Sequence, residues 1–128
     1  VMFFYILSFI ITAVELFSQI FRHQVSDKLV LPAIYASLLV IGLAMAFTFY
    51  FIELNSPGSF THIHQGDLAI GDLVYYSFMT QLTVGFGDIV PVTSMARSIT
   101  IIFNVFAHFY EIVIVSIIVS KYLRSKDQ

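Results

Sequence analysis

The chain has 128 residues, of which 59% are hydrophobic and only 11% are charged, and its formal net charge is −2. Soluble domains carry about 25% charged residues, so the composition argues against a soluble protein and for one that lies in a lipid bilayer. The absence of cysteine excludes disulfides, thiolate metal sites and thiol nucleophiles. We expect no nucleic-acid partner.

The first 21 residues are apolar. A polar residue recurs in this stretch every three or four positions: Ser8, Thr12, Glu15, Gln19 and Arg22. This spacing predicts a helix with one narrow polar stripe. We assign residues 1–28 to an N-terminal apolar helix and a short cytoplasmic linker. Two interpretations stay open, a spanning helix whose polar stripe packs against protein and an interfacial helix on the inner leaflet.

Two later runs are long enough to cross a membrane. Residues 29–52 carry no charge, and as a helix of roughly 36 Å they exceed a hydrocarbon core of about 30 Å. Pro32 stands near the start of this run, where a missing N–H costs little. Residues 98–120 form the second run, in which only three strongly polar residues occur between its serine ends: Asn104, His108 and Glu111.

The placement of charge predicts the orientation. The basic residues are Arg22, Lys28, Arg97, Lys121, Arg124 and Lys126. All but Arg97 flank the start of the first spanning run or the end of the second, and the positive-inside tendency places both of these ends in the cytoplasm. The connection of residues 53–97 then faces outward. Its acids should attract cations: Glu53, Asp67, Asp72 and Asp88.

Within this outer connection the sequence becomes apolar again at residues 73–84. Asp72 is a candidate N-cap or first-turn acid for a helix there. Such a helix measures roughly 18 Å, which is too short to cross the bilayer. Irregular backbone at membrane depth is tolerated where it is buried in protein or lines a watery pathway. A short apolar helix followed by a glycine-rich loop therefore predicts a re-entrant hairpin.

The loop, residues 83–88, reads Thr-Val-Gly-Phe-Gly-Asp and is called the TVGFGD segment below. Two glycines separated by one residue permit backbone angles that let successive carbonyl groups point the same way. Four such strands around an axis would present rings of oxygen atoms that replace the hydration shell of K⁺. Placed between a short helix and a second spanning helix, the segment resembles the selectivity filter of the tetrameric potassium channels.

The resemblance implies specific roles for this segment. K⁺ would be bound by the carbonyl oxygens of four residues, Thr83, Val84, Gly85 and Phe86. The hydroxyl of Thr83 would add the innermost ring, and Gly87 would complete the filter. Phe86 stands where many family members carry tyrosine, and the missing hydroxyl removes one hydrogen bond behind the filter.

The resemblance also extends to both sides of the segment. Residues 90–93 and Arg97 are similar to the stretch that leads into the inner helix of two-helix bacterial channels. Tyr75 and Tyr76 stand where such channels carry an aromatic cuff, and with Asp88 they are the expected filter supports. An interfacial aromatic belt is a compatible interpretation of both tyrosines.

The second spanning run carries an unusual polar face. Its members are spaced by four, three and four residues: Asn104, His108, Glu111 and Val115. The resemblance places this face at the pore cavity. A charge at membrane depth usually faces water or a partner, so Glu111 either lines the cavity or pairs with His108 or a neighbouring helix as a buried structural contact. In the cavity it would concentrate K⁺ or bind intracellular Mg²⁺ or polyamines as blockers. His108 is either a pH sensor or an ordinary hydrogen-bonded residue.

The two histidines of the outer connection have two interpretations. His62 and His64 form an i, i+2 pair that either binds a divalent metal or consists of ordinary loop residues. Apart from these histidines, no nucleophile–base pair or metal-ligand cluster is apparent, so we expect no catalytic activity and no cofactor apart from permeant K⁺.

The predicted fold is an all-α membrane protein with an outer helix, a re-entrant pore helix and filter loop, an inner helix and the N-terminal apolar helix. Residues 29–122 are the predicted pore domain, and residues 123–128 are a short cytoplasmic tail. Three further copies of the chain would complete a homotetramer around a central pore, surrounded by lipid in the plasma membrane. The expected function is passive K⁺ conduction. A weakly selective cation channel of this architecture and a membrane-anchored interaction subunit are the alternatives.

Overall fold

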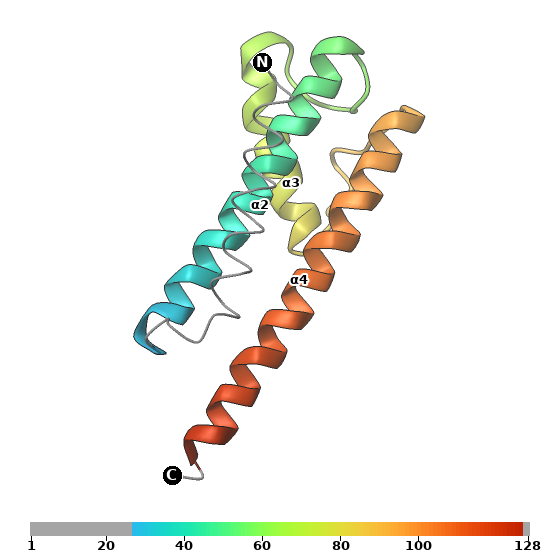
Figure 1. The fold of residues 1–128 in the computed structure, drawn as a ribbon. Helices are drawn as coiled ribbons and strands as arrows, with labels where there is room; N and C mark the ends of the chain where they lie inside the picture. The colour runs from blue at the N-terminus through green and yellow to red at the C-terminus, as the bar shows by residue number, and fades with distance from the viewer. Residues whose placement is uncertain (1–26, 127–128) are drawn as a thin grey trace.

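The structure, a computed structural model, describes residues 27–126 and is built from helices (Figure 1). Its elements are α2 (Asp27–Asn55), the 3₁₀ turn η1 (Gly66–Leu68), α3 (Ala69–Gln81) and α4 (Ser94–Lys126). The predicted all-α architecture, with a short helix between two long ones, is confirmed. The predicted N-terminal helix lies outside the described residues, so both interpretations of residues 1–21 stay predictions.

The two long helices are apolar enough to cross a membrane. Each contains a 21-residue candidate span, Tyr35–Asn55 in α2 and Ser94–Ile114 in α4. At about 1.5 Å per residue such a span matches the hydrocarbon core. Only 33% and 17% of these windows are buried within the chain, whereas a core helix of a soluble protein would be mostly buried. Length, composition and exposure together indicate membrane-spanning helices.

The long helices run antiparallel, so the start of α2 and the end of α4 lie at the same end of the molecule (Figure 1). This arrangement agrees with the predicted placement of both ends on one side of the membrane. α2 begins earlier than predicted, at Asp27, so Pro32 is its sixth residue and lies inside the helix. Its missing N–H therefore removes an intrahelical hydrogen bond, contrary to the predicted position near the helix start.

The short helix α3 differs in its bounds from the prediction of residues 73–84. It begins four residues earlier, after η1, and it ends at Gln81. Asp72 lies in the first turn, as predicted, where a negative charge is favourable. The helix cannot continue through residues 82–84 because Thr83 adopts a left-handed conformation, with φ 57°.

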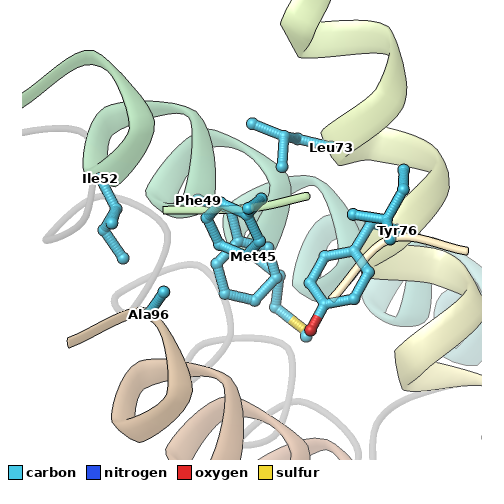
Figure 2. Close-up of a cluster of buried hydrophobic side chains, with 8 residues drawn as sticks. Met45, Phe49, Ile52, Leu73, Tyr76 and Ala96 are labelled. Carbon is cyan, nitrogen blue, oxygen red and sulfur yellow. The ribbon is translucent and has the colours of Figure 1, made fainter. Parts of the chain in front are cut away.

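A hydrophobic core joins the three helices near the outer connection. Its buried members are Met45, Phe49, Ile52, Phe60, Leu73, Tyr76, Ile89 and Ala96. Phe49 of α2 lies at the centre, with its ring centroid 5.3 Å from those of both Phe60 and Tyr76. Figure 2 shows this packing of Phe49 between Leu73 and Tyr76 of α3 and Ala96 of α4. The core thus fixes α3 against both long helices.

The outer connection is clipped to the residues that follow the TVGFGD segment. The amide of Thr61 donates to the carbonyl of Val90 at 3.0 Å, and the amide of Val92 donates to that of Ser59 at 2.8 Å. These hydrogen bonds flank an antiparallel bridge between Phe60 and Pro91. Because a bridge pairs two extended segments, the chain on both sides of the TVGFGD segment is held in place.

Candidate functional site

The TVGFGD segment begins as the cap of α3. The amide of Val84 donates to the carbonyl of Met79 at 2.9 Å, and the amide of Thr83 donates to that of Thr80 at 3.1 Å. With Leu82 as the C-cap, these are the two hydrogen bonds of a Schellman motif, in which the residue after the cap is left-handed and usually glycine. Here that residue is Thr83, so a threonine occupies a conformation that is unfavourable for it.

The sign of φ alternates along the segment. Thr83, Gly85 and Gly87 have φ values of 57°, 55° and 77°, while Val84 and Phe86 stay outside the left-handed region. In an ordinary strand successive carbonyls point to opposite sides, and reversing φ at every second residue turns them toward one side. Gly85 and Gly87 thus supply two of the three positive φ values of this alternation. Thr83 supplies the third, in a conformation that is unfavourable for a threonine.

The outer end of the segment is held from two sides. The phenol of Tyr75, on α3, donates a hydrogen bond to Asp88 Oδ2 at 2.8 Å. His62, from the outer connection, places its Nδ1 3.0 Å from the main-chain oxygen of Asp88. The other carboxylate oxygen of Asp88 accepts from the amide of Ile89 at 3.0 Å. Asp88 is thus tied to α3, to the outer connection and to its own following turn.

These contacts change the acidity of both partners in the Tyr75–Asp88 pair. The hydrogen bond from Tyr75 stabilises the carboxylate and lowers the pKa of Asp88 below its usual value. The same hydrogen bond raises the pKa of Tyr75, because the phenol is held in its protonated, donating form. At neutral pH Asp88 is therefore ionised, and it places a negative charge at the outer end of the TVGFGD segment.

The two predicted supports Tyr75 and Tyr76 lie on different sides of α3. Tyr75 is 37% exposed and contacts Asp88, whereas Tyr76 is 7% exposed and packs against Phe49 and Phe60 in the core. Consecutive residues on a helix point about 100° apart, so one tyrosine can contact the segment while its neighbour anchors α3 to α2. The structure brings Tyr75 and Asp88 together and places Tyr76 in the hydrophobic core.

The two histidines of the outer connection have separate partners. His64 contacts Asp72 Oδ2 through its amide at 2.6 Å and through Nδ1 at 2.8 Å. The amide of His64 is the main reason that the pKa of Asp72 is lowered. His62 instead faces Asp88. Within residues 27–126 no group of three or more His, Cys, Asp or Glu side chains is placed to hold a metal ion.

The polar face of α4 is arranged along one side of the helix. Asn104 donates through Nδ2 to the carbonyl of Thr100 at 2.9 Å, so its amide is partly satisfied within its own helix. His108 Nδ1 and Glu111 Oε2 are 3.8 Å apart, with side-chain exposures of 63% and 29%. That separation is longer than a hydrogen bond. The side chain of Val115 lies outside what the structure describes.

Glu53 and Gln81 hold positions that the sequence pattern does not predict. Glu53 accepts from the amides of Gly58 at 2.6 Å and Phe60 at 3.2 Å, so it shapes the turn after α2 and does not simply add to the outer field. Gln81 is 3% exposed and bonds to the carbonyl of Leu38 across two helices. No local sequence pattern singles out Gln81, because α3 carries other polar residues and the Leu38 contact depends on how the two helices pack.

Comparison with known proteins agrees with this architecture. A family model described as "Ion channel" matches residues 37–124, which include most of the outer span, α3, the TVGFGD segment and most of α4. No curated protein matches the sequence. The matched region covers 88 of the 128 residues, and the chain therefore belongs to this family of ion channels.

Proposed function

We propose that the protein is the pore-forming subunit of a potassium-selective channel, in which four copies surround one conduction pathway. K⁺ passes passively down its gradient through rings of carbonyl oxygens from Thr83, Val84, Gly85 and Phe86. Gly87 and Asp88 complete the outer end of this filter. We place the channel in the plasma membrane, with the start of α2 and the end of α4 in the cytoplasm.

The observation that carries this proposal is the alternation of φ along residues 83–87. Carbonyls turned toward one side supply a ladder of oxygen atoms in place of a hydration shell. The ladder starts at the carboxyl end of α3, where the helix dipole contributes partial negative charge. Along the pathway, the cation is therefore stabilised first by the carbonyl oxygens and then by the partial negative charge at the carboxyl end of α3.

The surface of one chain supports assembly with further copies. Phe86 and Val84 are 71% and 48% exposed, although a carbonyl ladder needs protein around it at membrane depth. One face of α4 also exposes a series of large apolar side chains: Ile101, Ile102, Val105, Phe106, Phe109 and Ile112. Copies of the chain packed around an axis, together with lipid, would cover these surfaces.

Flux measurements on the purified chain in liposomes test the proposal. The expected result is K⁺ efflux that exceeds Na⁺ efflux under matched gradients. Equal K⁺ and Na⁺ flux would instead support the weakly selective cation channel. No flux of either ion, from liposomes in which the protein is folded, would support the membrane-anchored interaction subunit and would overturn the proposal.

In the proposed pore, the polar face of α4 lines the cavity below the filter. Glu111 would then concentrate K⁺ or bind Mg²⁺ or polyamines from the cytoplasmic side. Its 3.8 Å separation from His108 leaves the carboxylate without a close hydrogen bond to that ring. We expect Glu111→Gln to lower conductance and to weaken block by internal Mg²⁺, measured in planar bilayers. Unchanged conductance and unchanged block would assign Glu111 to a structural contact.

His108 gives a separate test of the same cavity. In a single chain 63% of its side chain is exposed. Histidine titrates near neutrality, so we expect cytoplasmic pH to change the current. A current–pH curve that is the same in the wild type and in His108→Ala would remove the sensor role.

A further inference from the structure

We propose that Gln81 is a positioning residue for the filter, because it fixes the last turn of α3 against the outer helix α2. The inference rests on the proposed function, since it concerns how the TVGFGD segment is placed. Gln81 does not contact the permeant ion in this scheme. It acts through the backbone of the turn that leads into Thr83.

Gln81 makes a hydrogen bond between two helices in a buried place. Its Nε2 donates to the main-chain oxygen of Leu38 at 3.1 Å. The side chain is 3% exposed, and it belongs to the last residue of α3. Many other side-chain hydrogen bonds on these helices return to the same helix, as for Thr48 and Thr80. The Gln81 bond instead fixes one helix relative to another.

Gly42 provides the room for this contact. A Cβ atom at position 42 would lie 2.4 Å from Cε1 of Phe78 and 2.8 Å from Oε1 of Gln81. Both distances are shorter than any ordinary carbon contact, so a side chain larger than that of glycine at position 42 would displace the side chains of Phe78 and Gln81. The side chains of Phe78 and Gln81, in the last turn of α3, therefore pack directly against the backbone of α2 at Gly42.

Among residues 27–126 of one chain, the oxygen of the Gln81 amide has no hydrogen-bond partner. Its Oε1 is buried and unsatisfied among the described residues. A buried acceptor without a partner is destabilising, and an apolar side chain of similar size would avoid that cost. Within one chain the amide therefore acts through its donor side, which bonds to the carbonyl of Leu38.

The last turn of α3 also determines where the filter begins. Residues Met79 and Thr80 of that turn provide the carbonyls that accept from Val84 and Thr83. A displacement of the turn is therefore transmitted through these hydrogen bonds to the first carbonyls of the ladder. Binding sites of this kind need their groups held to within about 0.5 Å. Gln81 thus fixes the position of the first carbonyls of the ladder relative to α2.

The first test replaces Gln81 by methionine, which is close in length but has neither the donor nor the unsatisfied acceptor. We expect Gln81→Met to keep or raise the thermal midpoint of the purified protein, because the unsatisfied buried acceptor is removed, while the K⁺/Na⁺ flux ratio in liposomes falls below the wild-type value. Thr48→Val, which removes a hydroxyl that bonds within α2, is the matched control and should keep the wild-type ratio.

Gly42→Ala tests the same contact if Gln81→Met fails to fold. The added methyl group meets Phe78 and Gln81, so the flux ratio should fall in the same direction. Gly71→Ala, on the exposed face of α3 with nothing within 4 Å of the added carbon, is its control and should leave the ratio unchanged.

The outcomes separate the inference from the proposed function. A wild-type protein without K⁺ preference would overturn the proposed function and this inference with it. A selective wild type with unchanged ratios in Gln81→Met and Gly42→Ala would overturn the inference alone. A fall in the thermal midpoint of Gln81→Met with an unchanged flux ratio would assign Gln81 to stability and would also overturn it.

Discussion

The outer and inner parts of the α2–α4 pair are held together in different ways. At the outer end, three kinds of contact connect α2, α3, α4 and the loops between them. These are the aromatic core around Phe49, the contacts of Asp88, and the backbone hydrogen bonds between residues 59–61 and 90–92. Toward the inner end, α3 no longer lies between the long helices (Figure 1). At the level where α3 ends, one residue before Leu38, a buried hydrogen bond between the hydroxyls of Ser37 and Tyr110 connects α2 with α4 directly.

This difference suggests that the outer and inner parts of the α2–α4 pair have different roles. The outer part contains the TVGFGD segment, whose geometry tolerates little displacement. In the inner part α4 has neither glycine nor proline between residues 94 and 121, so it is expected to move as one rod, without an internal hinge. Within residues 27–126, the TVGFGD segment is therefore held by more tertiary contacts than the inner part of the α2–α4 pair. Three predictions test this comparison.

The largest expected effect is on the aromatic core of the outer part. Phe49 is 0% exposed, with ring contacts to Phe60, Tyr76 and Phe103. Phe49→Ala should lower the free energy of unfolding by about 3 kcal/mol, because it opens a cavity where three segments meet. Denaturant unfolding in detergent measures this change. Leu39→Ala, at a position 57% exposed on α2, is the control, and equal losses in both variants would contradict the comparison.

An intermediate effect is expected at the outer mouth. The hydrogen bond from Tyr75 lowers the pKa of Asp88 in the folded protein. The stabilisation of the folded protein by this hydrogen bond is therefore present above the usual carboxyl pKa of about 4. That contribution is lost as the outer pH falls through the lowered folded pKa. Tyr75→Phe removes the donor, and acid inhibition of flux should then begin at a higher outer pH than in the wild type.

Liposome flux as a function of outer pH gives the readout for Tyr75→Phe. Tyr35→Phe, at a tyrosine 69% exposed on α2, controls for the loss of a phenol elsewhere in the protein. Coincident pH curves for the wild type and Tyr75→Phe would show that Asp88 is held without help from Tyr75.

The smallest effect is expected in the inner part. Ser37→Ala removes the hydroxyl that bonds to Tyr110 and should cost about 1 kcal/mol of stability, the net value of one hydrogen bond. The K⁺/Na⁺ flux ratio should stay at the wild-type value, while the open probability of single channels changes. Ser116→Ala is the control, because Ser116 bonds to Ile112 within α4. A change of the flux ratio in Ser37→Ala would couple the inner part to the filter.

Much of the architecture follows from the sequence because the bilayer restricts it strongly. A run of about 20 apolar residues has few options other than a spanning helix, so α2 and α4 are predictable from residues 29–52 and 98–120. Their ends are less predictable, since polar residues continue both helices beyond the apolar run. The predicted carboxyl end of α3, residue 84, is wrong by three residues for a related reason. Apolarity extends through residue 84, although the left-handed Thr83 ends the helix.

The candidate site is predictable where it depends on the backbone and less so where it depends on tertiary contacts. The spacing of Gly85 and Gly87 indicates the reversed φ angles, because glycine adopts them at little cost. The Tyr75–Asp88 contact and the Gln81–Leu38 contact join residues 13 and 43 positions apart. Their partners are set by how α3 packs on α2, which no local pattern specifies.

The left-handed Thr83 has a consequence for protein engineering. Because this residue both ends α3 and begins the alternation of φ, the helix and the TVGFGD segment share three hydrogen bonds. The amides of Val84 and Gly85 donate to Met79, and the amide of Thr83 donates to Thr80. The smallest transferable module is therefore the ten residues 79–88, with the last helical turn included. A graft of the six motif residues onto a foreign helix with a different ending would leave its first carbonyls pointing the wrong way.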